Sequence, residues 1–143
     1  HQEQIWQYLM GSRNPERGQA AAAKLQAEKL SVEPITIDVS TDESITAAGE
    51  IVASKFGRLD VLINNDGIGN DKEYVPGENF IRDVMLEAYN TNVFGAFQFL
   101  ETFKPLLEKS EIPRVVFMSS SLGSFGGRFG QGTGQFIGGR RQR

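Results

Sequence analysis

Short apolar runs alternate with longer amphipathic or alanine-rich stretches along the first 120 residues of the chain. The runs are rich in β-branched and aliphatic residues, which predicts strands at Trp6–Met10, Pro34–Val39, Leu59–Ile63 and Val115–Met118. The last two runs are almost wholly apolar, a pattern typical of strands that are covered on both faces. Repeated strand–helix–strand units predict a parallel sheet with right-handed crossovers.

Three helices are expected between these strands. They begin at Pro15 behind an Asn14 cap, at Ser40 or Thr41, and near residue 79. Gly57 ends the second helix, and the third extends to about residue 108 with apolar residues along one face. The element order therefore predicts an α/β fold.

The composition fits one soluble domain, because 39% of the residues are hydrophobic and 23% are charged. With no Cys and a single His, at position 1, neither a disulfide framework nor a metal cluster is expected. The sequence also contains no apolar stretch long enough to cross a bilayer and no secretory signal, which favours a cytoplasmic location and no membrane partner.

The C-terminal segment differs from the rest of the chain. Residues 123–143 contain eight Gly, four Arg and no acidic residue, so residues 126–143 are expected to form a disordered Gly/Arg-rich tail. Interspersed Gly, Arg and Phe are typical of nucleic-acid-binding tails. Four charges would give only weak and salt-sensitive binding, so nucleic acid is not an expected partner.

Polar residues follow each predicted strand, namely Ser12-Arg13, Asp38-Val39, Asn64-Asn65 and Ser119-Ser120. Parallel α/β sheets bind ligands outside the carboxyl ends of their strands, so these residues are expected to form one rim. The alternative is that the strands simply end in polar turn residues.

At these positions residues 9–125 resemble the short-chain dehydrogenase/reductase family of NAD(P)-dependent oxidoreductases. The matching motifs, in order, are Gly11-Ser12-Arg13, Asp38-Val39, Leu62–Gly67, Asn92–Gly95 and Val115–Gly123. The resemblance implies a partial Rossmann-type, doubly wound parallel sheet that lacks the family's first strand and its last strands. Residues 1–125 would then form an incomplete dinucleotide-binding domain.

The resemblance also implies cofactor-binding roles. Arg13, beside Ser12, would pair the 2′-phosphate of NADP, since a guanidinium fork matches phosphate geometry and indicates NADP over NAD. Asp38 would accept a hydrogen bond from the adenine amine and Val39 would pack on the ring. The alternatives are a solvated Arg13 and an Asp38 that only caps the following helix.

In the segment Asn64-Asn65-Asp66-Gly67, the resemblance implies that the backbone lies against the cofactor ribose and that the Asn64 side chain braces the sheet, so Asn64, Asn65 and Gly67 would bind the cofactor. The family has Ala at the third position, where this chain has Asp66. A carboxylate there would repel an anionic dinucleotide unless it turned to solvent.

Two catalytic roles follow from the same resemblance. Asn92 would help to hold a water molecule of the proton relay, and Ser120 would donate a hydrogen bond to the carbonyl of a small-molecule ketone or alcohol substrate. The sequence contains neither the family's glycine-rich turn nor its Tyr-x-x-x-Lys motif. The resemblance therefore implies weakened NADP binding and a chain that is catalytically incompetent by itself.

The family's first strand lies in the middle of its sheet. Without it, either the second and fourth strands pair directly or their backbone groups lack partners. A further alternative is a non-catalytic interaction module, in which the helix at residues 79–108 pairs with a full-length subunit as a homo- or hetero-oligomer.

Overall fold

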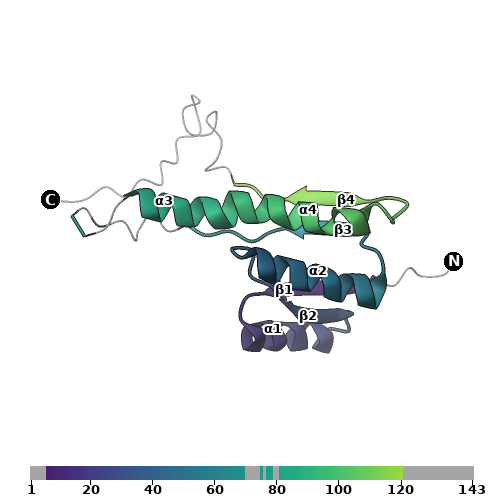
Figure 1. The fold of residues 1–143 in the computed structure, drawn as a ribbon. Coiled ribbons are helices and arrows are strands. Elements are labelled where there is room, and N and C mark those ends of the chain that lie inside the picture. Colours follow the sequence, from purple (N-terminus) through teal and green to yellow (C-terminus); the bar gives the residue numbers. More distant parts are fainter. Residues whose placement is uncertain (1–5, 70–74, 76, 79–80, 121–143) are drawn as a thin grey trace, which may run out of the picture.

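Strands and helices alternate along the chain (Figure 1). The computed structural model describes residues 6–69, 75, 77–78 and 81–120. In chain order the elements are β1 (Tyr8–Ser12), α1 (Pro15–Ala27), β2 (Val32–Thr36), α2 (Asp42–Phe56), β3 (Val61–Asn64), α3 (Ile81–Tyr89), a π-helical segment η2 (Asn90–Gly95), α4 (Ala96–Leu107) and β4 (Arg114–Phe117). The expected α/β element order is confirmed, and the tail at residues 126–143 lies outside the described residues.

The strands form two separate parallel pairs. β1 pairs with β2, with Met10 opposite Pro34, and β3 pairs with β4, with Ile63 opposite Val116. Among the described strands β1 and β3 do not pair with each other. The structure thus has a partial sheet, and the direct pairing that was the first of the two sequence-based alternatives does not occur in the described part of the chain.

The outer edge of β2 is protected against pairing. The Ile37 N–H donates to the Ser12 carbonyl. The backbone N–H and C=O groups of the odd-numbered residues of β2 therefore point toward β1, and those of the even-numbered residues point toward the outer edge. On that outer edge Pro34 has no N–H group, and the Gln26 side chain donates to the Val32 carbonyl at 2.6 Å. β2 is therefore built as the end of a sheet, whereas no described strand pairs with the inner edges of β1 and β3.

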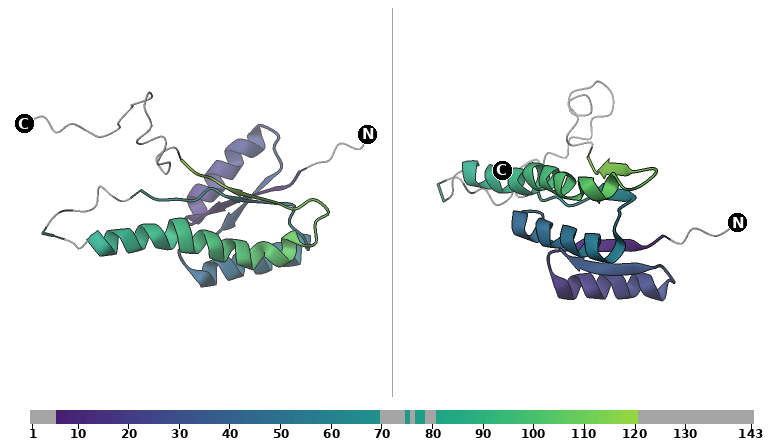
Figure 2. Two further views of the ribbon diagram at one scale, coloured as in Figure 1. Left: turned by 90° about the horizontal axis from the view of Figure 1, so that it is seen from above. Right: turned by 45° about the vertical axis from the view of Figure 1, so that its right-hand side comes forward.

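Helices α2 and α4 join the two strand pairs (Figure 2). Their buried side chains and those of the strands form one apolar cluster: Ile37, Ile45, Ala48, Val52, Leu62, Phe103, Leu106 and Leu107. Helix α1 packs against β1 and β2 on the opposite side from α2 (Figure 1). The core therefore lies between the strands and the α2–α4 layer.

The expectation that β3 and β4 are covered on both faces is wrong for the described residues. All four residues of β4 are exposed, and Ile63 in β3 is 55% exposed. Helix α4 covers the face of β3 that carries Leu62, and no described helix covers the opposite face. An apolar sequence pattern shows that a strand has side chains suited to burial. Whether they are buried depends on whether other elements of the chain cover both faces of the strand.

The element boundaries differ from the sequence prediction by one to three residues, and two of the differences bear on the site. β2 ends at Thr36 and not at Val39, so Asp38 and Val39 follow the strand. The helix expected at residues 79–108 is interrupted by η2, whose π-helical turns separate α3 from α4. None of the helices in the described part of the chain has the length and hydropathy needed to cross a bilayer.

Candidate functional site

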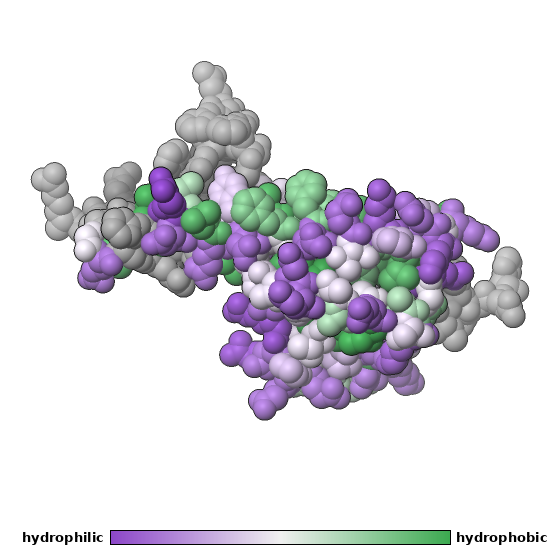
Figure 3. All heavy atoms as spheres, in the orientation of Figure 1, coloured by the Kyte–Doolittle hydropathy of each residue, from purple (hydrophilic) through white to green (hydrophobic). Residues whose placement is uncertain are grey.

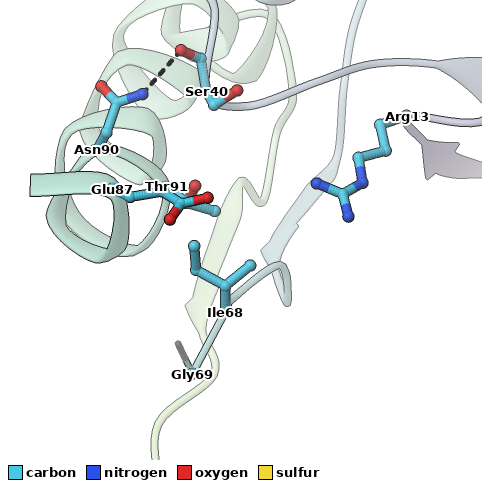
Figure 4. Close-up of a pocket in the computed structure, with 7 residues that line it drawn as sticks. All are labelled: Arg13, Ser40, Ile68, Gly69, Glu87, Asn90 and Thr91. Atoms are coloured by element: carbon cyan, nitrogen blue, oxygen red, sulfur yellow. Dashed lines mark hydrogen bonds between the residues drawn. The ribbon is translucent and has the colours of Figure 1, made fainter. Parts of the chain in front are cut away.

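A pocket of about 430 Å³ lies where β1, β2 and β3 end, and we call it the strand-end pocket. Its lining residues come from four parts of the chain: Arg13 after β1, Ser40 after β2, Ile68 and Gly69 after β3, and Glu87, Asn90 and Thr91 from α3 and η2. The Arg13 side chain extends toward the helix that carries Glu87, Asn90 and Thr91, with Ile68 below it (Figure 4). Of the residues expected to form a rim at the strand ends, Arg13 is the one that lines this pocket.

The turn between β2 and α2 is held by Asp38. Its Oδ1 accepts hydrogen bonds from the Ser40 hydroxyl at 2.6 Å and from the Ser40 backbone N–H at 2.9 Å. These bonds, together with the nearby positive charge of Arg13, lower the pKa of the Asp38 carboxyl below its ordinary value, despite an opposing effect of burial. Because Thr41 is the N-cap of α2, Asp38 is not the cap that the alternative interpretation required.

The loop after β3 is held by Asn92 in η2. The Asn92 Oδ1 atom accepts from the Ile68 N–H and its Nδ2 donates to the Ile68 carbonyl, both at 2.8 Å. This two-point contact fixes Ile68 at the pocket wall. Asp66 is exposed, and its Oδ1 accepts from the Gly67 N–H at 3.0 Å, so its carboxylate is turned to solvent as the cofactor hypothesis requires.

Asn64 ends β3 and is only 9% exposed. Its carbonyl accepts from the Met118 N–H, whereas its side-chain Nδ2 has no partner among the described residues. A buried amide without a partner costs about 1–3 kcal/mol. The free amide lies on the strand whose inner edge is unpaired in the described structure.

Of the residues predicted from the sequence, Arg13 lines the strand-end pocket. Five others lie one or two residues from a lining residue along the chain: Ser12, Asp38, Val39, Gly67 and Asn92. Asn65 lies three residues before Ile68. Ser12 bonds to the backbone of Asn14 in the β1–α1 turn. Ser120 is exposed and follows β4 by three residues, outside the pocket lining. Their roles toward cofactor and substrate stay predictions.

Sequence reasoning missed Asn90 and Thr91. The Asn90 Nδ2 donates to the Ser40 carbonyl at 3.0 Å and so joins η2 to the β2–α2 turn (Figure 4). The available signal was the pair Asn90 and Asn92 inside a helix, since asparagine is a poor helix former whose amide competes for backbone partners.

The family model described as short chain dehydrogenase matches residues 2–131. The chain belongs to the short-chain dehydrogenase family. Members of this family are oxidoreductases that bind NAD(P). This short-chain dehydrogenase is 39% identical over 121 residues to a short-chain dehydrogenase of Penicillium roqueforti, a match that covers 82% of this chain and 47% of the relative.

Two solved structures extend the comparison. Menthone neomenthol reductase from Mentha piperita superposes with a TM-score of 0.71 at 27% identity, over 81% of this chain and 52% of the reductase. An alcohol dehydrogenase from the archaeon Thermococcus sibiricus, complexed with 5-hydroxy-NADP, gives a TM-score of 0.66 at 25% identity, over 78% and 47% of the two chains. This short-chain dehydrogenase therefore has a Rossmann-like fold and spans about half the length of the relatives that it matches.

Proposed function

We propose that this chain carries the adenosine 2′-phosphate half of an NADP(H) site in a carbonyl or alcohol oxidoreductase. The observation behind the proposal is the strand-end pocket, in which the Arg13 guanidinium stands among residues from three strand ends and η2. Residues 1–125 would be the dinucleotide-binding part of a cytoplasmic enzyme whose substrate is a small ketone or alcohol, and the menthone neomenthol reductase match supports that substrate class.

The residues around the pocket fit a phosphorylated adenosine. Arg13 is exposed and is absent from the two ion pairs between described residues, Lys55–Glu33 and Arg58–Asp60, so its donors can reach a phosphate. Asp38 and Val39 directly precede Ser40, which lines the pocket, and a carboxylate acceptor and an apolar side chain would suit the adenine amine and ring there. The bound 5-hydroxy-NADP of the Thermococcus sibiricus relative supports the choice of NADP over NAD.

The pyrophosphate of the cofactor has fewer protein groups to bind to than the adenosine 2′-phosphate. The sequence holds no glycine-rich turn for the pyrophosphate, so we expect NADP(H) to bind more weakly than in a complete site. When bound, NADPH would supply the hydride. Asn92 would hold the loop at Ile68 against the cofactor, and Ser120 would donate to the substrate carbonyl oxygen.

Exchanging Arg13 for glutamine tests the proposal. The variant Arg13→Gln should bind adenosine 2′-monophosphate about 10- to 100-fold more weakly, since a hydrogen bond to a charged group contributes about 1.5–3 kcal/mol. Adenosine, which has no phosphate, should bind both proteins equally. Isothermal titration calorimetry measures both ligands.

The matched control is Arg17→Gln, which makes the same change four residues further along, outside the pocket lining. It should leave both affinities unchanged. Equal loss of nucleotide binding in the two variants would show that Arg13 contributes only to net charge and would refute the proposed phosphate contact.

A second candidate function is an interaction module, and an exposed apolar surface along α3, η2 and α4 favours it. Figure 3 shows apolar residues gathered along the upper rim of the molecule, over these helices and β4. The exposed large hydrophobic side chains on these helices are Ile81, Met85, Leu86, Tyr89, Val93, Phe94 and Phe97. A surface of this kind suits a second short-chain dehydrogenase subunit.

Sedimentation velocity separates the two functions. If the surface pairs subunits, the chain should sediment as a dimer and Phe97→Glu, at a side chain that is 62% exposed, should restore the monomer. Ser54→Glu, which adds the same charge on the exposed face of α2, is the control and should not change the oligomeric state. A monomer at all concentrations would rule out self-pairing through this surface.

A further inference from the structure

The π-helical segment η2 contacts the β2–α2 turn at two consecutive residues. Asn90, its first residue, donates to the Ser40 carbonyl at 3.0 Å. At its other end a Cβ built on Gly95 would lie only 2.1 Å from the Val39 carbonyl oxygen, so the two backbones are in direct contact. The position of the turn is therefore set by a segment about fifty residues away in the sequence.

Ser40 transmits this contact to Asp38. Its carbonyl accepts from Asn90, while its N–H and hydroxyl both donate to the Asp38 Oδ1. Both donors to Asp38 therefore belong to Ser40, whose carbonyl accepts the hydrogen bond from Asn90. A shift of Ser40 would therefore release the Asp38 carboxylate from its two hydrogen bonds.

A released Asp38 carboxylate could pair with the Arg13 guanidinium. The charge of Arg13 already acts on the Asp38 carboxyl, and carboxylate and phosphate compete for the same guanidinium donors. In an Asp38–Arg13 pair, the carboxylate would occupy the guanidinium N–H groups that would otherwise bind the phosphate. It would also place a negative charge beside an incoming phosphate.

We infer that Asn90 is a positioning residue for the 2′-phosphate, because its amide holds Ser40 so that Asp38 stays bonded to Ser40 and the Arg13 guanidinium stays open. The inference rests on the proposed NADP(H) site. Asn90 lines the strand-end pocket together with Arg13 and Ser40, so the amide acts within the site itself (Figure 4). In a helix asparagine is less favourable than alanine by several tenths of a kcal/mol, so helix formation gives no reason for an asparagine at this position.

The test compares the intact chain with Asn90→Leu, which keeps the size of the side chain and removes the donor. Binding of adenosine 2′-monophosphate should weaken about five- to tenfold, and binding of adenosine less than twofold, measured by calorimetry. Because Asp38 would exchange its two hydrogen bonds from Ser40 for the Arg13 guanidinium, the NMR signal of the Arg13 guanidinium N–H groups should shift in the variant. A purely structural role of Asn90 would change neither the ratio of the two affinities nor this signal.

Three further proteins complete the design. Asn90→Gln keeps an amide donor and should recover most of the preference for the phosphorylated ligand, which guards against loss of folding in Asn90→Leu. Gln98→Met removes an amide on α4 that, among the described residues, donates to Thr102 within its own helix, and it should behave as the unmodified chain. In Ser40→Ala, loss of the hydroxyl donor should reduce the same preference, with Asn90→Leu adding little to it.

The outcomes are distinguishable. If the unmodified chain prefers adenosine 2′-monophosphate and Asn90→Leu keeps that preference, the role of Asn90 is refuted and the proposed site stands. If the unmodified chain shows no preference for the phosphate, the proposed function and the inference both fail.

Discussion

Gly95→Ala should destabilise the chain by about 2–3 kcal/mol and abolish binding at the strand-end pocket. The new Cβ would lie 2.1 Å from the Val39 carbonyl oxygen and 3.0 Å from its carbon, and both are backbone atoms that cannot rotate away. Overpacking of this kind typically costs about 1–3 kcal/mol. Urea unfolding followed by circular dichroism gives the change in the free energy of unfolding.

An opposing effect must be weighed. Alanine is favoured over glycine in a helix by up to about 1 kcal/mol, so helix propensity alone predicts stabilisation. The clash should win, because relieving it requires η2 to move away from the β2–α2 turn, which also breaks the Asn90–Ser40 hydrogen bond. A small domain has only about 5–15 kcal/mol of stability in total, so the loss should be easily measured.

Gly67→Ala is the matched control. A Cβ there would meet the Asn92 Oδ1 at 3.4 Å, an ordinary contact, and the backbone φ of Gly67 is not positive. We expect a change below about 1 kcal/mol. A Gly95→Ala chain that is as stable as Gly67→Ala would show that η2 does not lie against Val39 in solution.

The ends of helices α1 and α2 were predictable from the sequence because local residues determine them. Asn14 caps α1 as expected, with its Oδ1 accepting from the Arg17 N–H at 2.8 Å, and Gly57 ends α2 with a φ of 72°. For β2, the sequence pattern predicts Pro34 as the first residue of the strand. Proline is also allowed on a free strand edge, and Pro34 occupies the outer edge of β2, which displaced the predicted strand by two residues at its start.

The features missed by sequence reasoning depend on contacts between distant segments. The apolar periodicity of residues 79–108 does not indicate a π-helical interruption. The π-helical segment η2 packs against Val39 and Ser40, which lie some fifty residues earlier in the sequence. In the same way, the strand-end residues predicted the location of the pocket, whereas its far wall comes from η2. One signal for that wall was the occurrence of two asparagines in one helix.

We expect this chain to reduce no carbonyl substrate with NADPH, whatever its affinity for the cofactor. Its tyrosines, Tyr8, Tyr74 and Tyr89, are each followed four residues later by a residue other than lysine, so the acid pair implied by the family resemblance has no counterpart in the sequence. A positioned general acid typically contributes a factor of about 10²–10⁴ in rate.

The described residues do not replace that acid. Both polar atoms of the Asn92 side chain are already bonded to Ile68, and an aliphatic hydroxyl such as that of Ser120 is a weaker acid than the tyrosine phenol of the implied pair. Loss of NADPH absorbance with menthone or a simple ketone should therefore proceed at the buffer rate, and Ser120→Ala should not change it. A rate that is proportional to chain concentration and lost in Ser120→Ala would contradict this, because it would mean that a hydroxyl positioned after β4 can turn over substrate without the tyrosine–lysine pair.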